Sequence, residues 1–343
     1  MKKLKYLTIF LLPASVAASF TLQGILTFIP VILFFVLIPL AEHFLPADPE
    51  NLSESEKEIA ATDPFYDALL YLMVPLQIGF LVWYLNLITQ TSSTVELIGK
   101  TSSMGLMCGV IGINVGHELG HRIQRWEQLL GELLLATSLE NHFLPYHNRG
   151  HHHNVATPED PATARKNEPL YLFWMRSHFG SYIQAWQIEA ARLKIAGKHW
   201  FSFQNRMVIY TLAHLIIGVA IYLAFGAVGL VYFLIVASIG IILLETVNYI
   251  EHYGLLRKKR ENGTYDRVRR IHSWNSNHVF GRVILFELSR HSDHHYKADR
   301  PYQLLENHEE SPQMPTGYPG MMIIALIPPL FFRIMNPRIV LDE

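Results

Sequence analysis

Nine histidines fall into four short clusters whose spacing is typical of metal ligands. One metal ion is held by roughly three or four histidines, so nine of them indicate two ions. Neutral imidazole suits iron, zinc, copper and nickel. The sequence therefore predicts a two-metal site. Its expected ligands are His117 and His121 in HELGH, His147, His151 and His152 in HNRGHH, His252 in EHYG, and His291, His294 and His295 in RHSDHH.

The HELGH cluster spaces His117 and His121 four residues apart, which places both imidazoles on one face of a helix. The same letters match HExxH, the motif of zinc proteases. A zinc intramembrane metalloprotease is therefore a remote alternative. It would need only one more ligand and would leave the HNRGHH and RHSDHH clusters unused.

The other clusters extend the pattern. His147 and His151 repeat the four-residue spacing, with His152 at a neighbouring angle. His252 ends a long apolar helix at the membrane depth expected for His117. Adjacent histidines repel each other when protonated, and a metal removes that repulsion. Isolated histidines are expected to be ordinary polar side chains; these are His43, His178, His199, His214 and His308.

The positions of the clusters depend on the apolar segments between them. Half of the 343 residues are apolar and 17% are charged, against about 25% in soluble proteins. A membrane-spanning helix needs roughly 20 apolar residues. We predict an all-α integral membrane protein, a single catalytic domain over residues 1–343, with about six transmembrane helices in three hairpins and a cytoplasmic helical cap that carries the metals. The expected helices are 6–23, 25–41, 65–88, 102–121, 207–225 and 228–250.

The basic residues orient this topology. Of the 28 lysines and arginines, only Lys100 falls in an outer connection, and the others lie on the side of Lys2, Lys3 and Lys5. The positive-inside rule makes that side cytoplasmic, together with both termini and the histidines. The basic and apolar start could be a signal peptide, but a retained first helix is favoured because the next apolar run follows almost immediately.

Several features limit the remaining possibilities. Cys108 is the only cysteine, so this sequence forms neither an internal disulfide nor a four-cysteine iron site. The net charge of −1 gives no reason to expect a nucleic-acid partner. One helix carries a series of glycines that indicate close helix packing or, alternatively, a substrate tunnel. These glycines are Gly105, Gly109, Gly112 and Gly116.

The motifs HELGHR, HNRGHH, NYIEHYGL and LSRHSDHH resemble the four histidine motifs of the integral-membrane alkane hydroxylases. The resemblance extends to NVATPEDPATAR and HSWNSNH and covers residues 65–305. Generic histidine boxes also occur in membrane desaturases and in sterol or fatty-acid hydroxylases. EHYG together with RHSDHH points more narrowly to alkane hydroxylases and the related xylene monooxygenases.

This resemblance implies a nonheme diiron centre with the nine histidines as ligands, O2 as co-substrate, and electrons from a separate rubredoxin and its reductase. It also implies a bacterial inner membrane and terminal hydroxylation of medium- or long-chain n-alkanes to 1-alkanols. A membrane fatty-acid desaturase or hydroxylase, or a xylene-type monooxygenase, is the alternative. The chain departs from the family at Tyr146, where the second motif usually has glutamate.

Two further groups of charged residues accompany the expected site. Neutral imidazoles leave the charge of two divalent ions, about +4, to be offset by nearby carboxylates. The main candidates are Glu118, Glu140, Glu251 and Asp293, with Glu245, Asp160 and Asp299 as further ones. A basic run after EHYG suits either docking of an acidic electron carrier or membrane anchoring. It consists of Arg257, Lys258, Lys259 and Arg260.

Overall fold

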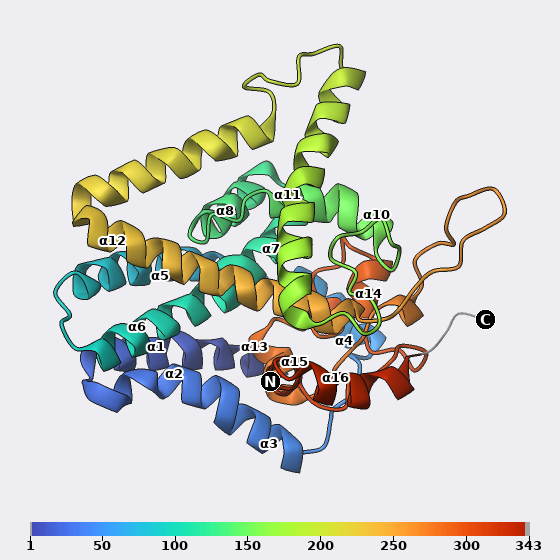
Figure 1. The fold of residues 1–343 in the computed structure, drawn as a ribbon. Coiled ribbons are helices and arrows are strands. Elements are labelled where there is room, and N and C mark those ends of the chain that lie inside the picture. Colours follow the sequence, from blue (N-terminus) through green and yellow to red (C-terminus); the bar gives the residue numbers. More distant parts are fainter. Residues whose placement is uncertain (1, 340–343) are drawn as a thin grey trace. The chain divides into compact units, whose positions relative to one another are not determined.

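The regular secondary structure of residues 2–339, the part that the structure, a computed structural model, describes, is helical (Figure 1). Extended pairing within this part is limited to two isolated bridges, Lys259 with Tyr265 and Asn275 with Gln313. The all-α prediction is therefore confirmed.

The chain forms two compact units, each assembled from three separate stretches. The first unit comprises Met1–Phe34, Asp67–Pro145 and Gln184–Leu244. The second comprises Phe35–Tyr66, Tyr146–Ile183 and Glu245–Glu343. His117 and His121 belong to the first unit, and the other seven histidines of the predicted site belong to the second. That the chain acts as one catalytic domain stays a prediction.

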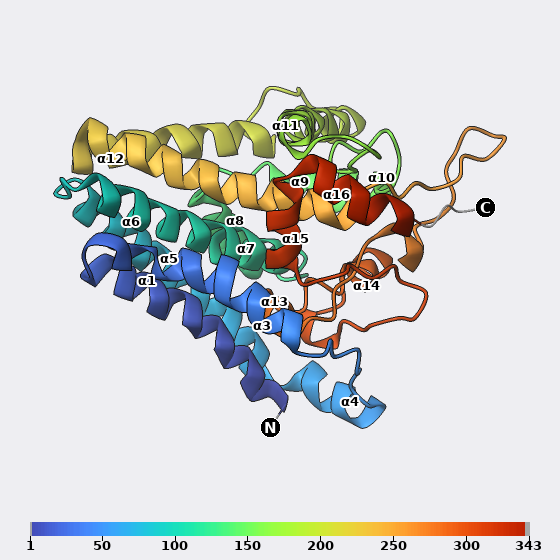
Figure 2. The ribbon, with the colours of Figure 1, turned by 60° about the horizontal axis from the view of Figure 1, so that its bottom comes forward.

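Long apolar helices dominate the first unit. Four helical stretches are long and apolar enough to cross a bilayer, which fits a membrane protein. They are Lys2–Thr21, Gly24–Phe44, Pro64–Ile88 and Arg206–His252. Within the first unit, α1 (Leu11–Thr21) packs beside α5 (Pro64–Ile88) and α6 (Thr94–Met107) (Figure 2).

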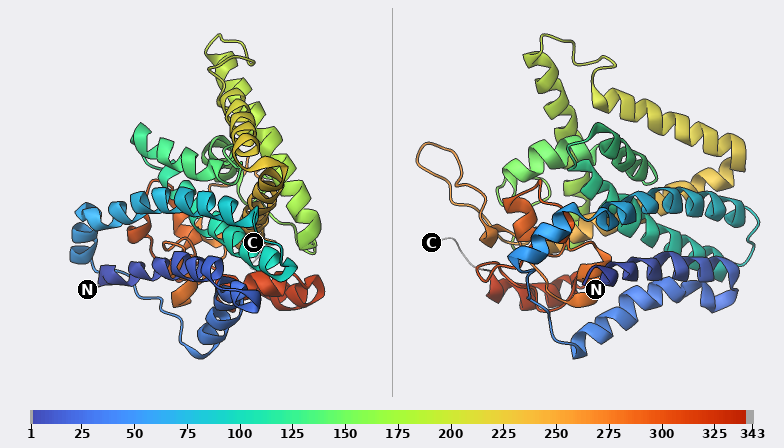
Figure 3. Two further views of the ribbon diagram at one scale, coloured as in Figure 1. Left: turned by 90° about the vertical axis from the view of Figure 1, so that its left-hand side faces the viewer. Right: turned by 180° about the vertical axis from the view of Figure 1, so that it is seen from behind.

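The longest helix, α12 (Arg206–His252), reverses direction at Gly226. Its φ of 68° and ψ of −173° are not helical, and glycine adopts such a backbone without steric cost. Figures 1 and 3 show the sharp bend. The bend separates the two predicted segments 207–225 and 228–250. Leu215 and Leu223 on the first arm are 61% and 78% exposed, as expected for side chains that face lipid.

The predicted segment 102–121 is helical in three consecutive pieces. These are α6 (Thr94–Met107), a π-helix η4 (Cys108–Ile113) and α7 (Asn114–Gly120). All six predicted segments are therefore helical, although the six-span hairpin topology and the cytoplasmic cap stay predictions.

The glycine series in these pieces is explained by close helix packing. A Cβ atom on Gly105 would lie 2.5 Å from Ile239 of α12, and one on Gly109 would lie 2.9 Å from Leu243. Farther along, α7 packs closely against α8 (Arg125–Ala136). These contacts favour the packing interpretation over the substrate tunnel at these positions.

The second unit surrounds the end of α12 with short helices. They are α3 (Ile38–Phe44), α4 (Glu54–Thr62), η5 (His147–His151), α10 (His152–Asn154), η6 (Arg270–His272), α13 (Val279–Ile284), α14 (His291–Tyr296), η7 (Tyr302–Leu304), α15 (Tyr318–Ala325), α16 (Pro328–Met335) and η8 (Asn336–Arg338). Helix α11 (Leu170–Ile195), like α12, contributes residues to both units.

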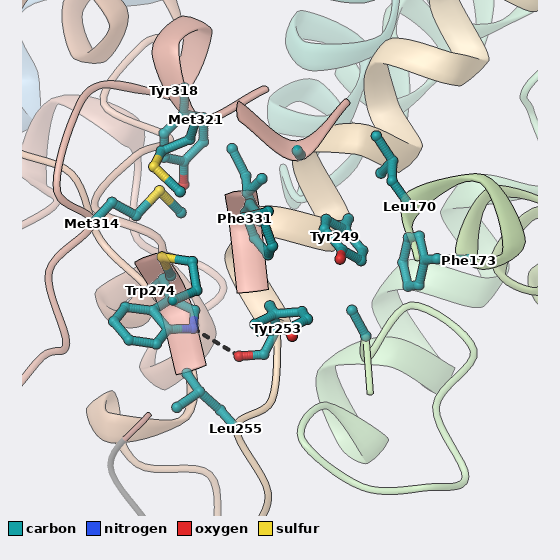
Figure 4. Packing of buried hydrophobic residues seen from close by; sticks show 14 residues of the cluster. Leu170, Phe173, Tyr249, Tyr253, Leu255, Trp274, Met314, Tyr318, Met321 and Phe331 are labelled. Carbon is teal, nitrogen blue, oxygen red and sulfur yellow. Dashed lines mark hydrogen bonds between the residues drawn. The ribbon is translucent and has the colours of Figure 1, made fainter. Parts of the chain in front are cut away.

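An apolar core fixes the end of α12 within the second unit (Figure 4). Tyr249 and Tyr253 of α12 pack there against Phe331 of α16. Trp274 is buried in the same core and donates its indole N–H to the Tyr253 carbonyl at 2.9 Å. This packing holds the helix end that carries His252.

We predict that Gly131→Ala weakens the contact between α7 and α8. The added Cβ would lie 2.8 Å from the Gly116 carbonyl oxygen and 3.2 Å from the Gly120 nitrogen, both rigid backbone atoms. The expected cost is ~1–3 kcal/mol, measured as a lower thermal unfolding midpoint in detergent. Gly79→Ala is the control, because no heavy atom lies within 4 Å of its Cβ position. Equal midpoints for the two variants would contradict the prediction.

Candidate metal centre

Four histidines of the second unit converge on one point. His151 ends η5, His252 ends α12, and His291 and His295 lie one turn apart on α14. One ring nitrogen from each lies within 4.8 Å of the others, and all four side chains are buried. Three distant parts of the chain therefore build one four-histidine cluster.

The contacts within this cluster exceed what hydrogen bonding can satisfy. His291 Nε2 lies 3.1 Å from His252 Nε2, 2.9 Å from His295 Nε2 and 3.2 Å from Glu251 Oε2. A neutral imidazole nitrogen carries either one proton or one lone pair, so it cannot serve three partners. Nitrogens bound at ~2.1 Å to one ion, near right angles, are about 3 Å apart. The spacing fits ligands of a shared cation.

His151 shows the arrangement of a metal ligand most directly. Its Nδ1 lies 2.9 Å from Asp160 Oδ2. Its Nε2 is buried and has no hydrogen-bond partner among the described residues. A carboxylate on one nitrogen fixes the tautomer that leaves the other nitrogen free to bind metal.

A second cluster in the same unit contains His147, His152 and His294. One ring nitrogen from each lies within 4.8 Å of the others. The Nε2 atoms of His147 and His152 are 2.9 Å apart, and the ring centroids of His152 and His294 are 4.8 Å apart. Three histidines form a partial ligand set that still requires further donors.

The π-helix η5 (His147–His151) assigns these neighbours to different clusters. The ring centroids of His147 and His151 lie 5.2 Å apart, yet the two residues belong to different clusters. A π-helix bonds residues five apart, so His147 faces His152. His151 is then free to point into the four-histidine cluster.

In the first unit, His117 and His121 form a pair as predicted from their spacing. Their Nε2 atoms are 3.0 Å apart, and the rings meet edge to face with centroids 4.7 Å apart. His117 lies on α7, and its ring contacts Phe143. This pair alone provides two ligands.

Among the main carboxylate candidates, Glu251 contacts a histidine of the four-histidine cluster. Its Oε2 lies 3.2 Å from His291 Nε2, and its Oε1 accepts a hydrogen bond from Tyr318 at 2.7 Å. Glu118 pairs with Arg122 at 3.3 Å, and Glu140 lies 3.2 Å from His142.

Asp293 lies between two ligands in sequence but turns its carboxylate toward other partners. It accepts hydrogen bonds from Arg300 at 2.6 Å and from the Glu306 N–H at 3.0 Å. His308 Nε2 lies 3.0 Å from its other oxygen. Asp293 therefore anchors α14 from outside, and His308, which the sequence left as an ordinary side chain, is part of this anchor.

Asp160 is the most tightly held of the further candidates. Besides His151, it accepts hydrogen bonds from Tyr146 at 2.5 Å and Thr163 at 2.7 Å. Burial alone would raise its pKa, but His151, Tyr146 and Thr163 outweigh that effect and lower the pKa to about 2. Sequence reasoning missed the roles of Thr163 and Tyr318, because neither residue type in isolation signals a contact.

The four residues of the basic run after His252 have different environments. Arg257 turns inward and donates to the carbonyls of His153 at 2.7 Å and Asp266 at 3.0 Å. Arg260 pairs with Asp266 at 2.6 Å. Lys258 and Lys259 are exposed. Arg257 therefore anchors its loop, and the run does not present four equivalent cations.

Comparison with known proteins shows the family to which the chain belongs. The fatty acid desaturase family matches residues 96–324. Alkane 1-monooxygenase 1 of Pseudomonas aeruginosa is 42% identical over 312 residues, which cover 90% of this chain and 82% of that protein. Alkane 1-monooxygenase of Acinetobacter baylyi is 37% identical over 328 residues, 95% of this chain and 79% of that protein.

A related hydroxylase is more distant. The xylene/toluene monooxygenase hydroxylase component XylM of Pseudomonas putida is 30% identical over 280 residues, 79% of this chain and 73% of that protein. The chain thus belongs to the fatty acid desaturase family of membrane proteins. Within it, the chain belongs to the alkane 1-monooxygenase family, which confirms the resemblance drawn from the histidine motifs.

We predict that His252→Ala removes metal from the four-histidine cluster. With three ligands left, the metal content should fall from about two ions to about one per chain, measured by elemental analysis of detergent-purified protein. His199→Ala is the control, because His199 is exposed. An unchanged metal content in the His252 variant would exclude His252 as a ligand.

Proposed function

We propose that this protein is a nonheme diiron monooxygenase that hydroxylates the terminal carbon of medium- or long-chain n-alkanes with O2. The buried four-histidine cluster carries the proposal, because its ring nitrogens have the spacing of ligands that share one cation. The names of the relatives, alkane 1-monooxygenases, supply the reaction and the substrate class.

The proposed centre uses all nine predicted histidines. The four-histidine cluster holds one iron. The proposed ligands of the other iron are the remaining five predicted histidines, which are His117, His121, His147, His152 and His294. Ligand number supports this assignment, since neither the second cluster nor the pair of His117 and His121 fills a coordination sphere by itself. Zinc has no redox chemistry, so a monooxygenase with imidazole ligands favours iron.

The iron supplies the activation of O2, which no amino-acid side chain can provide for an unactivated C–H bond. The chain's own residues hold and shield the centre. Asp160 fixes the tautomer and orientation of His151. Burial of the four histidines excludes bulk water from the reacting atoms. Hydroxylation by O2 also consumes two electrons and two protons and releases one water.

The proposed substrate dissolves in the membrane that the protein is expected to span. An n-alkane dissolves in lipid, and the spans expose apolar side chains such as Leu215 and Leu223. We infer a bacterial inner-membrane enzyme that takes its substrate from the bilayer. The basic residues place both termini and the metal ligands on the cytoplasmic side.

The electrons come, in this proposal, from a rubredoxin and its reductase. The loop after α12 (orange in Figure 1) carries the exposed cations Lys258, Lys259 and Arg267. A pocket of about 490 Å³ beside this loop is lined by Arg257 and the predicted ligand His152. An acidic carrier bound here would lie next to a metal ligand, with its charge complementing the lysines.

The proposed reaction is tested by product analysis. With rubredoxin and its reductase, the purified protein should bind about two irons per chain and convert an n-alkane series to 1-alkanols. A fatty acyl lipid and xylene are supplied in parallel. Products from these substrates but not from alkanes would favour the desaturase or xylene alternative. Zinc without iron would favour the protease.

The docking surface is tested by charge reversal. Lys258→Glu with Lys259→Glu should raise the KM for rubredoxin ~10-fold at low salt, because it replaces attraction by repulsion. The effect should shrink near 1 M salt, where the screening length is about 3 Å. Lys194→Glu with Lys198→Glu is the matched control, because both lysines are exposed, one in the last turn of α11 and one just after this helix. Equal KM values for both pairs would assign Lys258 and Lys259 to membrane anchoring.

A further inference from the structure

Tyr146 lies in a chain of buried contacts that leads to a predicted metal ligand. Its hydroxyl is 2.5 Å from Asp160 Oδ1, and Asp160 Oδ2 is 2.9 Å from His151 Nδ1. All three side chains are almost fully buried and belong to the second unit. The chain ends at His151 Nε2, which has no hydrogen-bond partner among the described residues.

The direction of each hydrogen bond follows from its neighbours. The Ala162 N–H donates to the Tyr146 oxygen at 3.1 Å, so the phenol proton is directed toward Asp160. Asp160 accepts in addition from Thr163 at 2.7 Å. With Asp160 as acceptor, the proton of His151 lies on Nδ1. The Tyr146 hydroxyl and the His151 Nδ1–H therefore both donate to the Asp160 carboxylate.

We propose that Tyr146 is a positioning residue that sets, through Asp160, how much electron density His151 donates to its metal. This inference rests on the proposed metal centre. It concerns the position at which this chain carries tyrosine instead of the glutamate usual in the resembled family. A phenol keeps its proton beside a carboxylate, whereas a second carboxylate there would repel Asp160.

The sign of the effect follows from competition for the Asp160 charge. A strong hydrogen bond from Tyr146 withdraws charge from Asp160 and weakens it as an acceptor for His151 Nδ1–H. His151 is then less imidazolate-like and a weaker donor to the metal. A weaker donor stabilises the oxidised metal less, so Tyr146 raises the reduction potential of the centre.

A purely structural hydroxyl would behave differently. Removing it would lower stability but would give no graded response to the acidity of the phenol. The test therefore uses Tyr146→Phe, which deletes the hydrogen bond, and 3-fluorotyrosine at position 146, whose more acidic phenol strengthens it. Both are compared with wild-type protein loaded with iron in detergent.

The measurement is the midpoint potential of the iron centre, obtained by anaerobic redox titration followed by Mössbauer or EPR spectroscopy. Tyr146→Phe should lower the potential, with about a threefold to tenfold smaller equilibrium constant for reduction by a fixed donor. The fluorotyrosine protein should shift in the opposite direction. Iron content should stay at the wild-type value in both.

Tyr302→Phe is the matched control. Tyr302 is also buried, but its hydroxyl donates to the Tyr66 carbonyl at 3.2 Å. The iron centre of the Tyr302→Phe protein should therefore have the midpoint potential of the wild type. Iron-loaded proteins whose potentials are unchanged, or shift the same way for phenylalanine and fluorotyrosine, would overturn this inference alone. Wild-type protein without iron would overturn the proposed function and this inference with it.

Discussion

The structure depends on keeping unprotonated imidazoles about 3 Å apart in a buried site. Nitrogen lone pairs at this distance repel each other unless a cation or a proton lies between them, and desolvation disfavours the protonated form. The burial of His295 accordingly lowers its pKa well below the usual value. Such a cluster gains no stability without its metal, so the rest of the unit must hold the ligands in place.

The segments that carry the four-histidine cluster are held by carboxylates outside it. Asp160 holds His151, and Asp293 fixes α14 through Arg300 and His308. The anchors differ in charge balance. Asp293 is paired with an arginine, whereas the partners of Asp160 are histidine, tyrosine and threonine side chains and a backbone N–H. Glu251 is likewise held by Tyr318. Asp160 and Glu251, which have no lysine or arginine partner in these contacts, would offset the charge of one divalent ion bound by the four-histidine cluster.

The sequence predicted the composition of the site better than its internal arrangement. Histidine is seldom clustered without a metal, so residue type and spacing sufficed to select the candidates and the helical class. Spacing could not show how His147, His151 and His152 divide between two clusters. That depends on a π-helix, and nothing in the letters HNRGHH distinguishes a π-helix from an α-helix.

The carboxylates show the same limit. Asp293 lies between the predicted ligands His291 and His294 in sequence yet pairs with Arg300, while Asp160 is nine residues from His151 and contacts it directly. The orientation of a side chain depends on tertiary partners such as Arg300 and Thr163, which no local pattern identifies. Arg257 is a further case, because its inward direction follows from carbonyl groups of two other loop segments.

Two of the π-helices, η4 and η5, indicate how one sequence meets the demands of helix packing and of the histidine clusters. The π-helix η4 (Cys108–Ile113) lies in an apolar helix just before His117, and η5 (His147–His151) carries one histidine of each of the two clusters in the second unit. A residue beyond the α-helical repeat rotates every following side chain about the helix axis. Gly105 and Gly109 can therefore face α12, while His117, past the bulge, takes a direction that the regular repeat would not give. Packing and ligation place different demands on one helix, and the bulge allows both to be met.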